Sequence, residues 1–156
     1  MTKPVNWLTV EIPGKIVSWK RSGGGKGTPR FTPAEQRNYM GAVRMIVSAA
    51  MSRTGLKPLD GPILLVLTAS YLHPASWSAK RRAANHWKTS APDVDNLAKL
   101  TKDALNKMAW VDDARVAFMT VQKIYGASEK LVISIASLEG YDGKQDLIAG
   151  QGPGER

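Results

Sequence analysis

Five aspartates lie close together in a chain that is otherwise strongly basic. Residues 12–92 contain thirteen lysines and arginines but only two acidic residues, whereas residues 93–113 contain Asp93, Asp95, Asp103, Asp112 and Asp113. An extended or capping conformation at Asp93 would let its carboxylate and that of Asp95 point to one place, and the preceding proline favours such a break. Lys99 would follow Asp95 by one helical turn. The pattern therefore predicts two or three carboxylates beside an ammonium group.

Carboxylates that gather without histidine or thiol make a hard oxygen site, which suits Mg²⁺ or Mn²⁺. The chain has no cysteine and only two histidines, which excludes thiol nucleophiles and argues against histidine-rich metal centres. A divalent ion can activate water and neutralise charge on a phosphodiester, while a lysine can steady the attacking or leaving oxygen. These residue types therefore predict metal-dependent phosphodiester hydrolysis.

The same residues also have ordinary structural explanations, which the sequence leaves open. Asp93 could simply cap the helix that follows it. Asp95 and Lys99 could form an i,i+4 pair on a helix surface. Asp112 and Asp113 could be turn residues.

The positive charge predicts a polyanionic partner, above all nucleic acid. The 156 residues carry a formal net charge of +9, although such a charge could also serve solubility alone. A glycine-rich loop at residues 22–33 and an acid-free segment at 73–92 are the candidate DNA contacts. Trp77 and Trp87 in the second segment could stack on unpaired bases, or could cover the edge of the core. The candidate DNA-binding residues are Lys20, Arg21, Lys26, Arg30, Lys80, Arg81, Arg82 and Lys88.

Hydrophobic patterning predicts one α+β domain with a single mixed sheet and two main helices, in the order β-β-α-β-α-β-β. Helices are expected at residues 32–53, with Thr32 as N-cap, Pro33 in the first position and Glu35 completing a capping box, and at 93–108. Residues 62–72 form an uninterrupted apolar run, which is typical of a central strand. The other expected strands are 7–12 and 15–20, which could form a hairpin, and 114–125 and 130–138, joined in a second hairpin by the turn GASE.

The expected domain spans residues 1–139, and the glycine-rich residues 140–156 are expected to form a disordered tail. No apolar run is long enough to cross a bilayer, and the first residues do not resemble a signal peptide. We therefore expect a cytoplasmic protein without a membrane partner.

A longer motif adds a family resemblance to this interpretation. The string PDVDNLAKLTKDALN, followed by a tryptophan and a DD pair, resembles the RusA family of Holliday junction resolvases, small endonucleases found in phages and prophages. The opening EIPGKIVSWKR, the segment FTP and the run GPILLVLTASYLHP are similar as well. The resemblance covers roughly residues 8–138.

The resemblance implies an activity, a cofactor and a partner. The family's three metal-binding aspartates fall on Asp93, Asp95 and Asp113, and its essential lysine falls on Lys99. Family members are homodimers that bind four-way DNA junctions in recombination and repair and, with Mg²⁺, cut two symmetry-related strands. Asp112 and Asp103 receive no catalytic role from this comparison. The alternatives are a non-catalytic DNA-binding protein and a nuclease that acts on flaps or other branched DNA.

Overall fold

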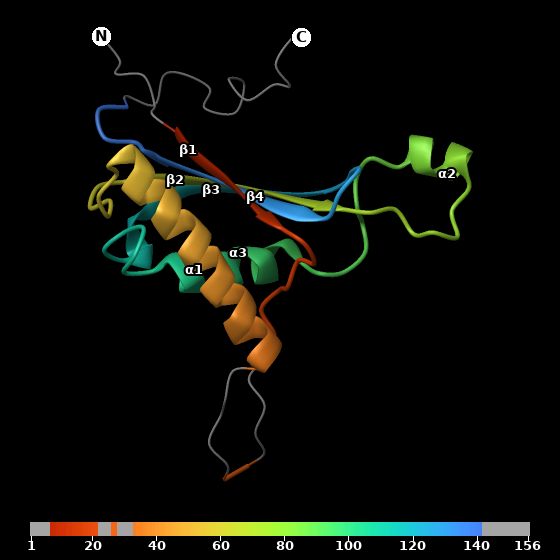
Figure 1. The fold of residues 1–156 in the computed structure, drawn as a ribbon, viewed down its shortest axis with the longest axis horizontal. Helices are drawn as coiled ribbons and strands as arrows, with labels where there is room; N and C mark the ends of the chain where they lie inside the picture. Colours follow the sequence, from red (N-terminus) through yellow and green to blue (C-terminus); the bar gives the residue numbers. More distant parts are fainter. Residues whose placement is uncertain (1–6, 22–25, 28–32, 142–156) are drawn as a thin grey trace.

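The protein folds as one mixed sheet with two helices packed on one face (Figure 1). Its computed structural model describes residues 7–21, 26–27 and 33–141. No helix in these ranges is long and apolar enough to cross a membrane. The predicted α+β class is confirmed. The strands are β1 (Trp7–Pro13), β2 (Ile63–Tyr71), β3 (Val116–Tyr125) and β4 (Lys130–Ser137), and the helices are α1 (Ala34–Thr54), α2 (Ala79–Ala84), α3 (Val94–Leu105) and the short 3₁₀ turn η1 (Asp113–Arg115).

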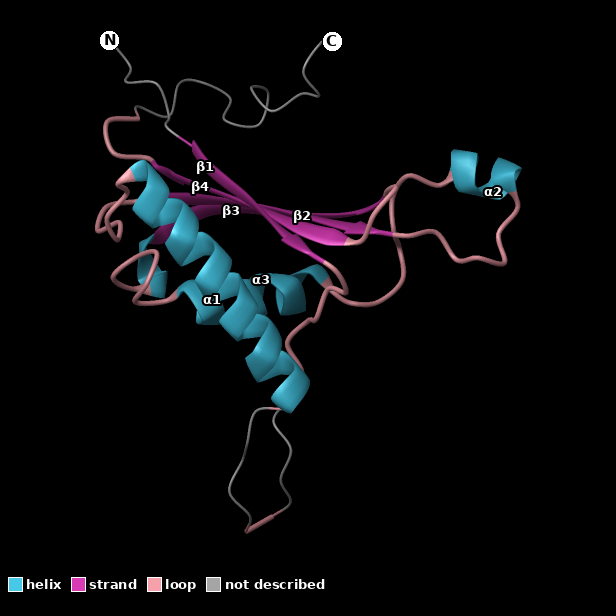
Figure 2. Cartoon of the chain, viewed as in Figure 1, coloured by secondary structure: helices cyan, strands magenta, loops and turns pink. Residues whose placement is uncertain are grey.

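The strand order in the sheet is β1-β4-β2-β3. Strand β4 runs antiparallel to both of its neighbours, and β2 pairs in parallel with β3. Most side chains of β2 are buried, including Leu65 and Leu67 with no exposed surface. The prediction of a central strand at 62–72 is therefore confirmed. Helices α1 and α3 cover one face of the sheet, while α2 stands apart at the end of an arm (Figure 2).

The predicted strand at residues 15–20 is wrong. The segment makes no strand pairing, because its N–H groups are taken by acceptors outside the sheet. The N–H of Ile16 donates to Glu129 Oε1 at 3.0 Å, and the N–H of Trp19 donates to the carbonyl of Asn96 at 3.1 Å. The segment therefore leaves the sheet and runs to the first turn of α3.

The predicted hairpin between the last two strands is also wrong, although both strands exist. Strand β2 lies between them, so the GASE connection must cross the end of β2. The N–H of Gly126 donates to the carbonyl of Tyr71 at 2.8 Å, and Ser70 Oγ donates to the carbonyl of Ser128 at 3.0 Å. A continuous apolar run favours a central position, in which both edges of β2 are paired with other strands. The sequence spacing of β3 and β4 does not reveal this insertion.

Helix α1 begins at Ala34 with Pro33 as its N-cap, one residue later than predicted, and Thr32 lies outside the described residues. No side chain caps this end, and Glu35 forms an ion pair with Lys15 at 3.0 Å instead of closing a capping box. Helix α3 ends at Leu105, three residues before the predicted end, and the chain turns at Lys107 with a φ of 61°. Residues 142–156 of the predicted tail are outside the described ranges, and the domain boundaries stay a prediction.

The crossing over β2 predicts opposite effects for two glycine substitutions. A Cβ at Gly126 would collide with Ser70 Oγ, so Gly126→Ala should break the bond from Ser70 to the GASE turn and lower the free energy of unfolding by about 1–3 kcal/mol. Gly41 lies within α1 and faces open space. Gly41→Ala should therefore raise the free energy of unfolding by about 0.5–1 kcal/mol. Urea denaturation measures both, and equal effects would contradict the crossing geometry.

Candidate active site

One surface pocket of about 330 Å³ brings predicted catalytic residues together from distant parts of the chain. Helix α3 supplies one wall, η1 contributes an aspartate and β3 contributes a methionine. Three of the four predicted catalytic residues, Asp95, Lys99 and Asp113, line it together. The described residues that line it are Asp95, Ala98, Lys99, Lys102, Asp103, Asp113 and Met119.

The amphipathic character of α3 determines which of its residues reach this pocket. Leu97, Leu100 and Ala104 are buried in the core, each with 1% or less of its surface exposed. Residues on the opposite side of the same helix, including Asp95 and Lys99, are therefore directed outward. Burial of the apolar stripe holds the wall of the pocket in place.

Asp93 occupies the N-cap position of α3 in an extended conformation, with φ −73° and ψ 148°, as expected. Its carboxylate makes no capping hydrogen bond, so the explanation that it merely caps the helix is wrong. The side chain is exposed just before the wall that carries Asp95, but it does not line the pocket. Among the described residues, no three acidic or histidine side chains form a group that could hold a metal ion. The sharing of one ion by Asp93, Asp95 and Asp113 thus stays a prediction.

Two residues without a predicted catalytic role, Asp103 and Trp19, orient the ammonium group of Lys99. Its Nζ lies 3.3 Å from Asp103 Oδ2 and 5.1 Å from the centre of the Trp19 ring. The i,i+4 ion pair therefore joins Lys99 to Asp103 and not to Asp95, whose carboxylate has no hydrogen-bond or ion-pair partner in the described part of the chain. Regular helical spacing could have indicated Asp103. No local pattern signals Trp19, because it is remote in sequence.

Asp113 is anchored to the hydrophobic core. The fully buried indole of Trp110 donates from Nε1 to Asp113 Oδ1 at 2.7 Å. The second carboxylate oxygen of Asp113, Oδ2, receives no hydrogen bond from any described residue. Asp112 has a different role, since its carboxylate caps η1 by accepting from the N–H of Ala114 at 2.8 Å. The turn-residue explanation therefore holds for Asp112.

Two lysines hold the loop that leads into Asp93. Lys123 Nζ donates to the carbonyls of Ser90 and Pro92, both at 2.7 Å. Lys88 Nζ donates to Ser90 Oγ at 2.6 Å and to the carbonyl of Ala91 at 2.7 Å. Partial burial, reinforced by the neighbouring Lys123 ammonium, lowers the pKa of Lys88. Lys88, a candidate DNA contact, is thus also an internal brace of the loop.

Three of the other candidate DNA contacts lie on the projecting arm. Lys80, Arg81 and Arg82 are exposed on α2, at the end of the projecting arm (Figure 1). The Arg81 guanidinium lies 4.2 Å from the ring centre of Trp77, which in turn packs against His73 and Tyr125.

Near the start of the chain, Lys20, Arg21 and Lys26 are exposed as well. Arg30 lies outside the described residues. None of the candidate DNA contacts that the structure describes lines the acidic pocket, so any part these residues have in binding concerns DNA beyond the reacting phosphate.

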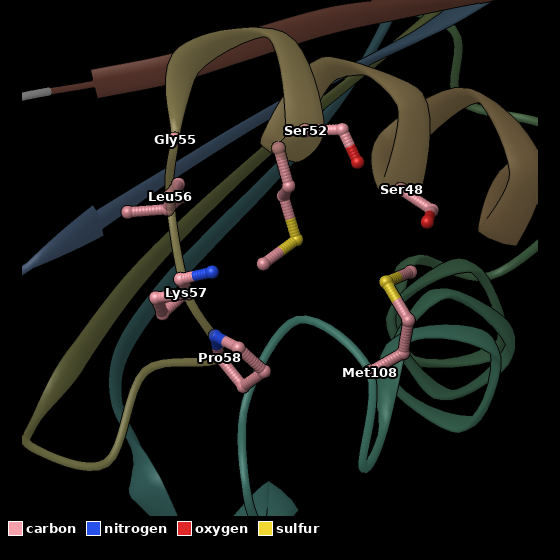
Figure 3. A pocket seen from close by; sticks show the side chains of 8 residues that line it. Ser48, Ser52, Gly55, Leu56, Lys57, Pro58 and Met108 are labelled. Atoms are coloured by element: carbon pink, nitrogen blue, oxygen red, sulfur yellow. The ribbon is translucent and has the colours of Figure 1, made fainter.

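A second pocket of about 390 Å³, at the end of α1, does not suit the same chemistry (Figure 3). Lys57 is the only ionisable residue among the described residues that line it, and two methionines also line it. Without a carboxylate or imidazole it offers no ligand that a divalent cation prefers. The pocket that contains Asp95 and Asp113 is therefore the better candidate active site.

A family model and one named relative indicate the same family. The family model for endodeoxyribonuclease RusA matches residues 13–136. A Bacillus subtilis (strain 168) protein named "Uncharacterized protein YqaN" is 28% identical over 109 residues, covering 66% of this chain and 75% of that protein. The crossover junction endodeoxyribonuclease rusA of Lactococcus phage r1t is 32% identical over 53 residues, covering 33% of this chain and 40% of that protein.

The Trp110–Asp113 bond predicts that two substitutions at its ends differ in their effect on stability. Trp110→Phe removes the donor and leaves space in the core, so it should lower the free energy of unfolding by about 2–4 kcal/mol. Asp113→Asn keeps an oxygen that can accept from Trp110, and its cost should be about 1 kcal/mol or less. Urea denaturation measures both values. A loss at Asp113→Asn as large as that at Trp110→Phe would contradict this assignment.

Proposed function

The chain belongs to the RusA family of endodeoxyribonucleases and is therefore a nuclease, and we propose that it resolves four-way DNA junctions with the help of a divalent cation. The observation that supports this most strongly is the single pocket lined by Asp95, Lys99 and Asp113 in a chain of net charge +9. A basic protein attracts the DNA backbone, and an acidic pocket within it offers a place for a cation at the reacting phosphate.

The residues around the pocket fit Mg²⁺ or Mn²⁺. Asp95 and the Oδ2 atom of Asp113 offer carboxylate oxygens that no described residue engages, and oxygen is the ligand that both ions prefer. Asp93, one residue before α3, is the proposed third ligand, and the lysine-braced loop limits where it can lie. When bound, such an ion polarises the phosphate and lowers the pKa of a coordinated water.

Lys99 is proposed to contact the scissile phosphate. Asp103 and the Trp19 ring hold its ammonium at the pocket wall, where it can donate to a phosphate oxygen and offset developing negative charge. The pair with Asp103 is half exposed, so an incoming phosphate can compete for the ammonium. The basic side chains on and near α2, together with Lys20 and Arg21, are proposed to contact the DNA arms.

A cleavage assay with a labelled four-way junction tests the active-site assignment. With Mg²⁺ the wild type should make paired symmetric nicks, while Asp95→Asn should cut at least about a hundredfold more slowly and still bind the junction. Glu139→Gln is the matched control, since it removes the same charge from an exposed side chain outside the pocket and should cut normally.

Other outcomes would favour the alternatives. Binding by the wild type without Mg²⁺-dependent nicking would favour a non-catalytic DNA-binding protein. Cleavage of flaps with sparing of junctions would keep the chemistry and overturn the proposed substrate. A cleavage rate of Asp95→Asn equal to that of the wild type would overturn the assignment of the pocket.

We also propose that the active form is a homodimer, because a two-fold symmetric substrate is matched best by two symmetric active sites. Light scattering at micromolar protein should give twice the 17.0 kDa mass of one chain. The two nicks of one junction should then appear without release of a singly nicked intermediate. A particle of 17.0 kDa that nicks one strand per encounter would contradict the dimer.

A further inference from the structure

We propose that a pocket beside Trp87 is a subsite for one unpaired nucleobase of the DNA substrate. The inference rests on the proposed DNA-cleaving function and adds to it a contact with a base, whereas the acidic pocket would contact the phosphate. The pocket measures about 480 Å³, within the range of roughly 300–1,000 Å³ that is usual for small-molecule sites. Its lining is Trp87, Lys88, Val94, Thr120, Val121, Gln122 and Lys123.

The base pocket adjoins the acidic pocket along both elements that form it. Val94 lines the base pocket and the next residue, Asp95, lines the acidic pocket. On β3, Met119 lines the acidic pocket, and Val121, two residues further along and on the same face of the strand, lines the base pocket. A strand whose phosphate lies at the acidic pocket would therefore place a neighbouring nucleotide at Trp87.

The indole of Trp87 is exposed although its backbone is firmly held. Trp87 forms a bridge with Ile124 at the outer edge of β3, and the flanking bond from the N–H of Lys88 to the carbonyl of Lys123 is 3.0 Å. The side chain nevertheless keeps 60% of its surface exposed. Trp77 differs, because its ring is enclosed by His73, Tyr125 and Arg81. Trp87 is thus a pre-positioned flat surface on which a base can stack at little cost in side-chain order.

The remaining lining suits a base better than a purely apolar ligand. Val94, with 43% of its surface exposed, and Val121 offer apolar contact, while the amide of Gln122 can bond the edge of a base. The carbonyl of Lys123 faces the outer edge of β3, where it accepts from Lys88. The backbone groups of every second residue in a strand point to the same edge, so the N–H and C=O of Val121 face this edge as well. They can therefore also bond the edge of a base.

Charge favours a nucleic acid as the occupant. The described lining residues contribute the two ammonium groups of Lys88 and Lys123 and no carboxylate, so a phosphate attached to a stacked base meets favourable potential. A base within a duplex presents no free face for stacking, whereas a base at a branch point can be unstacked. The subsite therefore selects DNA that has an unpaired or easily unpaired base beside the cleaved phosphate.

Fluorescence of 2-aminopurine, an adenine analogue that is quenched when it stacks, tests the proposal. One four-way junction carries the analogue at the branch point, and a linear duplex carries it fully paired; both are titrated with protein without a divalent cation. The wild type and Trp87→Phe should quench the branch-point analogue further on binding. Trp87→Ala should not quench it and should raise the junction Kd roughly five- to 150-fold, with little change for the duplex. Met45→Ala is the matched control, since Met45 is 68% exposed on α1 and lines neither pocket.

The outcomes separate the two proposals. Equal quenching and equal Kd for the wild type and Trp87→Ala, with unchanged thermal unfolding, would overturn the base subsite, and so would a wild type that binds no DNA. A loss of junction affinity that Trp87→Phe does not restore would also overturn it, because a phenyl ring can stack as well. If the wild type quenches the branch-point base in a Trp87-dependent way but never nicks the junction with Mg²⁺, the subsite stands and the cleavage proposal falls.

Discussion

The hydrogen bond from the buried Trp110 indole to Asp113 joins the hydrophobic core to the acidic pocket. The backbone on both sides of Trp110 is held by Leu59, which donates to the carbonyl of Ala109 at 2.9 Å and accepts from the N–H of Val111 at 3.0 Å. An aspartate next to a turn would otherwise be free to take many orientations. Here the packing of the core decides where its carboxylate lies, while the apolar stripe of α3 does the same for Asp95. The burial of apolar side chains therefore fixes the positions of both carboxylates in the pocket, and this burial is the strongest stabilising contribution in the protein.

Electrostatics around the pocket are arranged so that negative charge is retained at little cost. The carboxylates of Asp93 and Asp95 are exposed, so water screens their mutual repulsion, and no described cation neutralises them. The nearby cationic side chains that the structure describes form ion pairs or hydrogen bonds with other groups and not with these two carboxylates. Lys99 is paired with Asp103, and the ammonium groups of Lys88 and Lys123 are directed at backbone carbonyls of the preceding loop. This leaves the acidic oxygens available to an external cation.

The sequence predicted the parts of this protein that depend on local pattern. The apolar period of α3 and the continuous run of β2 predicted those elements closely, and the aspartate spacing indicated residues that line the pocket. Strand pairing could not be predicted in the same way, because β4 inserts between β1 and β2 from a distant part of the chain. The contact of Lys99 with Trp19 and the difference in exposure between Trp77 and Trp87 were also inaccessible, since both depend on which remote side chains arrive beside them.

The strand order has a consequence for when the enzyme becomes active during its synthesis. Strand β1 has β4 as its partner in the sheet, and among the strands that the structure describes β4 is the last to be synthesised. The residues that line both pockets lie between β2 and the end of β3, so they are synthesised before the sheet can close. Long-range pairing of this kind forms late and cooperatively. A nascent chain thus carries the residues of the proposed active site without the framework that aligns them, and cutting ability should arise only when β4 has joined the sheet.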